Sequence, residues 1–344
     1  MKILWLRPSK GDNISVRRER IASHLRDRGF EITIRDASGL DAIGATYEAL
    51  TGKYDIIAGN VRMGLFIGYP LARILRKPVL GDVSDPITDI EYLPEPFYRF
   101  FGWLEWKLLK RADAAVFVYE SSYQEAIERG ITDAVKLPNV VDHDLFENPD
   151  PSVVRESQRI LQSISIDLDK PIAIYIGGFS DNYCINEIVE AATKAPDWQF
   201  VFIGEGELKQ TVSNASEDIE NVYYPGAFRY ELMPGFLSHA DVGFCFKNAE
   251  QPLKLKEYGA ADIPTIVQFG ELERWYDKDE LVFIEPRSED IVTALDQLKK
   301  PSNRESYAKE FKSSIETRNW SDIADEYENL FNKISDVNGD NHIE

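Results

Sequence analysis

The sequence has little of what marks several classes of protein. It contains two cysteines in 344 residues, Cys184 and Cys245, and both lie inside apolar runs without the spacing of metal ligands. We therefore predict no disulfide framework, and we expect both thiols to be buried. No pair of aspartates spaced by one residue follows a strand in the second half, so the sequence requires no metal or other cofactor.

Long hydrophobic runs and excess positive charge are also missing. No run approaches the roughly 18 to 20 apolar residues that span a bilayer, and residues 1–6 are too few for the apolar core of a targeting peptide. The 39 Lys and Arg residues face 59 Asp and Glu residues, which gives a formal charge of −20. Because nucleic acids bind to basic surfaces, this acidic balance argues against a nucleic acid partner. We expect a soluble, cytoplasmic protein.

Apolar strand-like runs alternate with helical patterns along the whole chain. In the first half these runs are residues 2–6, 30–34, 55–58, 78–83, 114–118 and 135–137. The alternation restarts in the second half, with runs at residues 171–176, 199–203, 222–224, 242–246, 264–267 and 282–284. Such alternation builds parallel sheets with right-handed crossovers. We predict an α/β protein with two Rossmann-like, doubly wound domains that face each other across a cleft.

The boundary between the two domains is expected near residue 150. The sequence PNVVD, residues 138–142, ends the first alternation, and the polar residues 147–151 follow as a linker. We place the N-terminal domain at residues 1–147 and the C-terminal domain at residues 151–317, because domains of roughly 150 to 170 residues suit a chain of this length.

Residues 244–267, FCFKNAEQPLKLKEYGAADIPTIV, form the most informative stretch of the chain. They predict a strand, a polar loop and a helix from about Pro252 to Ala261, since proline suits the first helical turn. Lys254 and Glu257 are three residues apart, so they share one helix face near its start. The free N–H groups and positive dipole end of a helix start favour an anion. We predict an anion-binding site here.

Polar residues also follow a strand in the first half. Asp82, Ser84 and Asp85 end the run at residues 78–83, on the edge of a parallel sheet where ligands bind. A helix cap or a turn is the other interpretation of the two aspartates. Both interpretations stay open at the level of the sequence.

The segment from residue 92 to residue 109 is rich in aromatic side chains, with basic residues among and directly after them. On an amphipathic helix, interleaved aromatic and basic side chains can lie at a bilayer interface. One interpretation is a peripheral membrane contact through residues 97–109, at the cytoplasmic face of a membrane. The other is a helix that packs inside the first domain.

A strand–loop–helix pattern at the N-terminus is followed, between residues 138 and 267, by six motifs in a fixed order. They are PNVVD (138–142), YIGGFS (175–180), FIGEGE (202–207), YYPGAF (223–228), LSHADVGF (237–244) and PLKLKEYGAADIPTIV (252–267). Together they resemble the retaining nucleotide-sugar glycosyltransferases of family 4, which have the GT-B fold. The resemblance implies that the N-terminal domain binds the acceptor and the C-terminal domain the donor. The helix at residues 318–335 resembles the family's terminal helix, which completes the first domain.

The resemblance implies transfer of a sugar from a nucleotide-diphosphate donor, a UDP- or GDP-sugar, to a glycan or a lipid-linked acceptor. Glu257 matches the glutamate that binds the ribose hydroxyls, and Lys254 is placed to meet a phosphate. The backbone of Gly177 and Gly178 would hold the diphosphate. Further candidates are Arg229 on the donor side and, on the acceptor side, Asp82, Ser84, Asp85 and Arg17.

The sequence departs from the family pattern at one important position. The first glutamate of the motif, eight positions before Glu257, falls on Ala249, and Glu250 follows one place later. Either the loop is shifted so that Glu250 serves the sugar, or that contact is lost. The alternatives are therefore a GT-B epimerase or synthase, and a non-catalytic GT-B protein that binds a sugar nucleotide.

Overall fold

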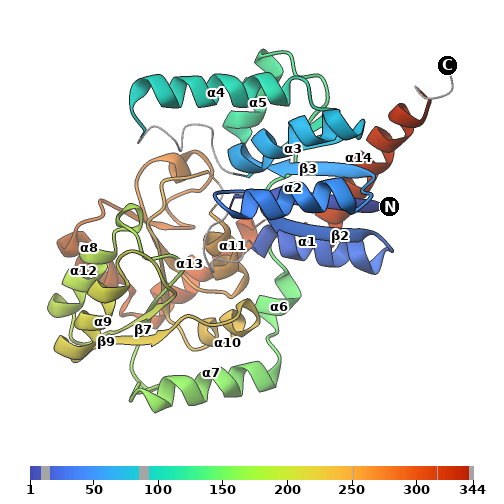
Figure 1. The fold of residues 1–344 in the computed structure, drawn as a ribbon. Coiled ribbons are helices and arrows are strands. Elements are labelled where there is room, and N and C mark those ends of the chain that lie inside the picture. Colours follow the sequence, from blue (N-terminus) through green and yellow to red (C-terminus); the bar gives the residue numbers. More distant parts are fainter. Residues whose placement is uncertain (9–15, 85–92, 251, 316, 341–344) are drawn as a thin grey trace. The chain divides into compact units, whose positions relative to one another are not determined.

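The computed structural model describes residues 1–8, 16–84, 93–250, 252–315 and 317–340, and the chain forms two compact units (Figure 1). The first unit comprises Met1–Asn139 and Trp320–Glu344, and the second comprises Val140–Asn319. The second unit is thus inserted into the chain of the first. The change of unit comes at residue 140, so helix α6 (His143–Glu147), expected at the end of the first domain, belongs to the second unit.

The first unit is built on one sheet of six parallel strands in the order β2-β1-β3-β4-β5-β6. The strands are β1 (Lys2–Arg7), β2 (Glu31–Asp36), β3 (Ile56–Asn60), β4 (Val79–Val83), β5 (Ala114–Phe117) and β6 (Ala134–Lys136). All residues of β3, β4 and β5 are buried. Burial on both faces explains why these strands appear in the sequence as continuous apolar runs.

Helices cover this sheet. They are α1 (Val16–Asp27), α2 (Asp41–Thr51), α3 (Val61–Leu75), α4 (Glu95–Leu109), α5 (Glu120–Glu128) and α14 (Trp320–Asp340). Helix α14 lies beside α1 (Figure 1), and its Tyr327 and Phe331 rings lie 5.2 and 6.4 Å from the ring of Trp5. The end of the chain therefore supplies part of the core of the first unit.

The last two helices of the chain belong to different units. Helix α13 (Pro301–Ser314) packs in the second unit, whereas α14 begins at the buried Trp320 in the first unit. Residues 315 and 317–319 are not helical. The helix must end because the chain passes from one unit to the other at this point.

The second unit contains another sheet of six parallel strands, in the order β12-β11-β10-β7-β8-β9. The strands are β7 (Ile172–Ile176), β8 (Gln199–Ile203), β9 (Val222–Gly226), β10 (Val242–Cys245), β11 (Thr265–Gln268) and β12 (Val282–Ile284). The strand order reverses at β7, which lies between β8 and β10. In doubly wound sheets, ligands bind outside the carboxyl ends of the strands at this switch point.

The remaining helices flank the second sheet. They are α6, α7 (Pro151–Ser163), α8 (Ile185–Lys194), α9 (Lys209–Asp218), α10 (Met233–Leu237), α11 (Leu253–Ala260), α12 (Ser288–Leu298) and α13. The polar stretch expected to be a linker is the start of α7: Asp150 accepts a hydrogen bond from the N–H of Ser152, and Pro151 occupies the first turn.

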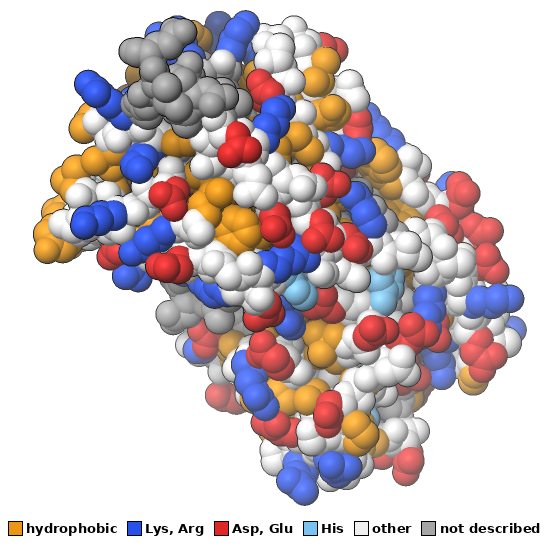
Figure 2. Space-filling model, turned by 90° about the vertical axis from the view of Figure 1, so that its right-hand side faces the viewer, with side chains coloured by type: hydrophobic (Ala, Val, Ile, Leu, Met, Phe, Trp, Pro, Cys, Tyr) orange, Lys and Arg blue, Asp and Glu red, His pale blue; other side chains and the backbone are white. Residues whose placement is uncertain are grey.

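The surface mixes charges of both signs. Figure 2 shows acidic and basic side chains interspersed over one face of the molecule. In the part of the chain that the structure describes, no helix is both long and apolar enough to cross a membrane.

Candidate functional site

The glycine-rich turns after β7 and β8 pack against each other, backbone to backbone. The N–H of Gly177 donates to the carbonyl of Ile203 at 2.9 Å, and the N–H of Phe179 donates to that of Glu205 at 2.9 Å. A Cβ atom on Gly204, which has φ of +143°, would lie 1.9 Å from the carbonyl oxygen of Gly177. Only glycine fits there. These contacts hold the turn after β7 at the switch point of the sheet.

Lys254, in the first turn of α11, reaches this turn with its amine. A Cβ atom on Gly177 would lie 2.6 Å from Lys254 Nζ, so glycine at 177 leaves room for the amine. The Nζ atom lies 4.0 and 4.6 Å from the ring centroids of Tyr175 and Tyr183. Both distances suit an ammonium group above an aromatic face.

The amine of Lys254 is buried, and within the described residues it has no hydrogen-bond partner. Burial lowers the pKa of Lys254 to about 8, because the charged form loses its hydration. The nearby Lys247 lowers this pKa further, whereas Cys245 and Glu257 oppose the shift. A buried amine that lacks a hydrogen-bond acceptor is an incomplete arrangement, and an anion at the switch point would complete it.

A buried hydrogen bond joins helix α11 to the end of β7. The N–H of Ile176 donates to the hydroxyl of Tyr258 at 3.0 Å. This bond sets the rotation of the helix that carries Lys254 and Glu257. The side chain of Glu257 is buried, and so is that of Glu250 just before the helix. Ala249, where the family pattern has a glutamate, is also buried.

Two other predicted donor residues occupy different surroundings. The carbonyl of Gly178 accepts a hydrogen bond from the hydroxyl of Tyr175 at 2.7 Å. Gly178 therefore lies next to the Tyr175 side chain, whose ring contacts the amine of Lys254. Arg229 follows β9, which β8 separates from β7. Its guanidinium pairs at 2.8 Å with Glu156 on α7, and both side chains are exposed.

The predicted acceptor residues lie in a buried polar cluster of the first unit. Asn60, at the end of β3, donates from Nδ2 to the carbonyl and carboxylate of Asp82 at 2.9 and 3.2 Å and to the hydroxyl of Ser84 at 3.1 Å. Tyr327 of α14 donates to Asp82 Oδ1 at 3.0 Å. Burial and the charge of Asp82 raise the pKa of Tyr327. Asp85 lies outside the described residues.

Arg17 is engaged within the first unit. It is 5% exposed, and its two terminal nitrogens donate to the carbonyls of Leu137 and Pro138, each at 2.9 Å. Its guanidinium lies 5.9 Å from the ring of Trp320. Arg17 therefore joins three parts of the first unit: α1, the segment after β6 and the start of α14.

The sequence alone did not identify Tyr175, Tyr183, Asn60 or Tyr327 as part of these groups. Asn60 had a recognisable signal, because it is a polar residue that ends an apolar strand, as Asp82 does. Its Oδ1 atom is buried and has no hydrogen-bond partner in the described part of the chain. Tyr175 lies inside an apolar run, which predicts a core residue. Tyr327 is far from Asp82 in the sequence, so their contact could not be predicted.

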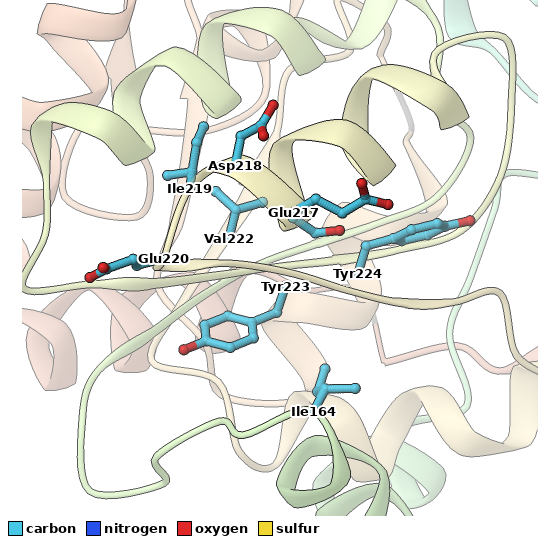
Figure 3. Close-up of a pocket in the computed structure, with 9 residues that line it drawn as sticks. Ile164, Glu217, Asp218, Ile219, Glu220, Val222, Tyr223 and Tyr224 are labelled. Carbon is cyan, nitrogen blue, oxygen red and sulfur yellow. The ribbon is translucent and has the colours of Figure 1, made fainter.

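A surface hollow of about 290 Å³ lies elsewhere in the second unit, near the beginning of β9 (Figure 3). Its lining includes Tyr223 and Ile164 below the strand and the acidic Glu217 and Asp218 above it. Glu220 adds a third carboxylate. A diphosphate would be repelled there. No group of three His, Cys, Asp or Glu residues in the described segments could hold a metal ion.

Known proteins resemble the second unit in sequence. Residues 156–314, all within the second unit, match the family "Glycosyl transferases group 1". A relative from Bacillus subtilis (strain 168), named "Putative teichuronic acid biosynthesis glycosyltransferase TuaH", is 26% identical over 222 residues. The match covers 58% of this chain and about half, 53%, of the relative. The family model thus covers most of the second unit.

Solved structures resemble the whole chain. Anabaena HepE in complex with UDP and glucose has a TM-score of 0.76 at 15% identity, covering 97% of this chain and all of its own. The sucrose-phosphate synthase of Thermosynechococcus elongatus has a TM-score of 0.75 at 16% identity, covering 98% of this chain and 99% of its own. At such identities the likeness shows the fold: two Rossmann-like units that match the GT-B glycosyltransferases, as the sequence predicts.

Proposed function

We propose that this chain is a retaining glycosyltransferase of family 4 that transfers a sugar from a UDP-sugar to a glycan or a lipid-linked acceptor. The observation that carries the proposal is the buried amine of Lys254, which has no hydrogen-bond partner among the described residues and lies beside Gly177 at the switch point. It lies within the residues that match the glycosyltransferase group 1 family. Such an amine suits the diphosphate of a sugar nucleotide.

In this proposal the diphosphate binds between the turn after β7 and the start of α11. The backbone N–H groups of Gly178 and of the first turn of α11 would donate to phosphate oxygens. The ammonium group of Lys254 would meet the same oxygens and keep its proton, because a bound anion favours the charged form. As the bond to the anomeric carbon breaks, negative charge grows on the leaving diphosphate, and these donors stabilise it.

The two glutamates beside Lys254 would hold the rest of the donor. Glu257 would accept hydrogen bonds from the ribose hydroxyls, which needs a carboxylate rather than an amide. Glu250 would serve the transferred sugar in place of the missing carboxylate at Ala249. Arg229 would lie near the base, beside the backbone of residues 227–229.

The named complexes favour uridine as the base. HepE is described with UDP and glucose and with UDP-glucose. On the acceptor side, we place Ser84 next to the acceptor hydroxyl, with Asp82 and Arg17 as positioning residues and Asp85 as a further contact. The acceptor would be reached at the cytoplasmic face of a membrane.

A donor screen followed by a transfer assay tests the proposal. UDP-, GDP- and ADP-sugars are compared by thermal shift, because a ligand that binds only the folded state raises the melting temperature. We expect UDP-sugars to give the largest shift. Glu257→Gln should lower turnover by roughly 10- to 100-fold, since a hydrogen bond to a charged group is lost. Glu190→Gln, an exposed glutamate paired with Lys194, is the matched control. Unchanged turnover in Glu257→Gln contradicts the site assignment.

The second candidate function is a non-catalytic protein that binds a sugar nucleotide. Ala249 favours it, because a carboxylate expected at the transferred sugar is absent. Labelled UDP-sugar distinguishes the candidates. A transferase releases UDP and forms a labelled product only when an acceptor is present. An epimerase or synthase converts the labelled sugar into a different product, and a binding protein leaves the donor intact.

A further inference from the structure

Helix α4 presents three large aromatic side chains to solvent. Phe97, Phe100 and Trp103 are 57%, 53% and 54% exposed. They are spaced by three residues, so they form one face of the helix, which we call the aromatic face. The rings of Phe100 and Trp103 lie 6.0 Å apart, and Lys107 Nζ lies 4.4 Å from the Trp103 ring centroid. Lys107 thus continues the same face toward the end of the helix.

The opposite face of α4 is firmly packed. Trp106 is buried and stacks on Phe117 of β5 with ring centroids 6.0 Å apart. Glu105 is buried and pairs at 3.0 Å with Arg62 of α3. The interpretation as a packed helix therefore holds for one side of α4, where Trp106 belongs to the core, whereas Trp103 faces outward. Exposure of the aromatic face is not a sign of a poorly packed helix.

Helices α3 and α4 carry a net charge opposite in sign to that of the whole protein. Residues 61–77 and 95–111, which span α3, α4 and the residues just after them, contain eight Lys and Arg but two acidic residues, Glu95 and Glu105. The difference is +6 in a chain with a formal charge of −20. Lys107, Lys110 and Arg111 are exposed. Large exposed apolar residues on a locally basic surface are typical of sites that bind anionic membranes.

We propose that the aromatic face of α4 docks on an anionic lipid bilayer, with its rings at the headgroup boundary and the basic side chains on lipid phosphates. Aromatic rings favour this boundary, and each Lys or Arg near an anionic bilayer adds to binding. A second copy of the chain is a poorer occupant, because a symmetric contact would bring two basic helices together. The inference supplies a place for a lipid-linked acceptor and in that respect rests on the proposed function.

Vesicle co-sedimentation of the full chain, without any sugar nucleotide, tests the docking surface. The vesicles contain either phosphatidylcholine alone or equal parts of phosphatidylcholine and phosphatidylglycerol. We expect binding to the anionic vesicles that weakens with added salt. Replacing Phe97, Phe100 and Trp103 by serine should lower the partition by about tenfold or more. The control replaces Phe269 and Trp275, exposed aromatic residues of the second unit, by serine and should bind normally.

A charge variant tests the second part of the surface. Lys107→Gln, Lys110→Gln and Arg111→Gln together should lower binding to anionic vesicles by roughly fivefold per residue. Absence of binding by the parent protein overturns the inference, and so does full binding by the serine variant. A parent that ignores vesicles but dimerises through the aromatic face would assign that face to a second copy. Thermal shifts with UDP-sugars are measured without lipid. They test donor binding independently of the membrane, so a failure of docking is distinguishable from a failure of the proposed function.

Discussion

The two units use buried cationic side chains in opposite ways. In the first unit, the guanidinium of Arg17 donates to two backbone carbonyls and lies over Trp320. In the second unit, the amine of Lys254 is buried between aromatic rings, and the described chain offers it no hydrogen-bond acceptor. Both terminal nitrogens of Arg17 are bonded to protein carbonyls, whereas the amine of Lys254 has no protein acceptor among the described residues.

This difference separates a structural charge from a candidate ligand site. The sequence shows both residues as basic side chains near the start of a helix, and on that ground both are candidates. Burial alone does not distinguish them either. The hydrogen-bond partners do, because a buried donor without an acceptor is costly unless a ligand supplies one.

The largest expected effect comes from removing the cation of the second unit. Lys254→Gln should weaken UDP-sugar turnover by roughly 10²- to 10³-fold, because a charged donor to the leaving diphosphate is lost. The control is Lys299→Gln, a surface lysine paired with Asp197 and Asp296, which should behave as the parent. Steady-state kinetics of both variants makes the comparison. Equal activity in the two would mean that Lys254 is another structural cation.

Arg17→Met should have its main effect on folding rather than on the donor. It leaves two buried carbonyls without their donor, which costs about 2 to 4 kcal/mol of unfolding free energy. Arg229→Met, which breaks only an exposed ion pair with Glu156, should cost less than about 1 kcal/mol. Urea unfolding followed by tryptophan fluorescence measures both. Similar losses would remove the contrast between the two kinds of arginine.

The pH dependence of UDP binding should reveal the state of Lys254. Its pKa of about 8 in the free protein is lowered by burial, whereas a bound diphosphate favours the charged form. Affinity should therefore be highest below pH 8 and fall by up to about tenfold per pH unit above it. Calorimetry across this range checks the trend, and Lys254→Gln should abolish it. A parent profile as flat as that of the variant contradicts the assignment.

A smaller effect than that of Arg17→Met is expected at the hydroxyl of Tyr327. Tyr327→Phe removes its hydrogen bond to Asp82 and should cost about 1 kcal/mol of unfolding free energy. Tyr307→Phe, which loses an exposed hydrogen bond from Gln297, serves as the matched change and should be nearly neutral. A thermal melt of each variant measures the loss. Greater stability in Tyr327→Phe would show that burying the hydroxyl costs more than its hydrogen bond to Asp82 contributes.

The strands could be predicted from the sequence, whereas several helices could not. Apolar runs such as residues 171–176 and 199–203 mark strands buried on both faces, and they appear where expected. Helices α2 and α9 have no comparable signal. The buried residues of α2 are Ala45 and Ala49, and those of α9 are Val212 and Ala215. With so little apolar surface buried, their periodicity is too weak to stand out.

The candidate site was predictable where it depends on one continuous segment. Lys254 and Glu257 follow from the stretch at residues 244–267 and its resemblance to a known motif. The aromatic rings around Lys254 were not predictable, because Tyr175 belongs to strand β7, far from Lys254 in the sequence, and its apolar surroundings predict a core residue. The environment of Arg17 could not be predicted from the sequence either, because its partners are residues 137 and 138 and Trp320 of the last helix.

Helix α14 can complete the first unit only after the rest of the chain has been synthesised. Trp5 packs on Tyr327 and Phe331, yet the whole second unit, residues 140–319, must be synthesised between them. At typical rates this takes roughly 9 to 36 s. During that time the first sheet lacks a cover over Trp5, and a chaperone could recognise this exposed apolar surface. The unit that is synthesised first is therefore the last to be completed.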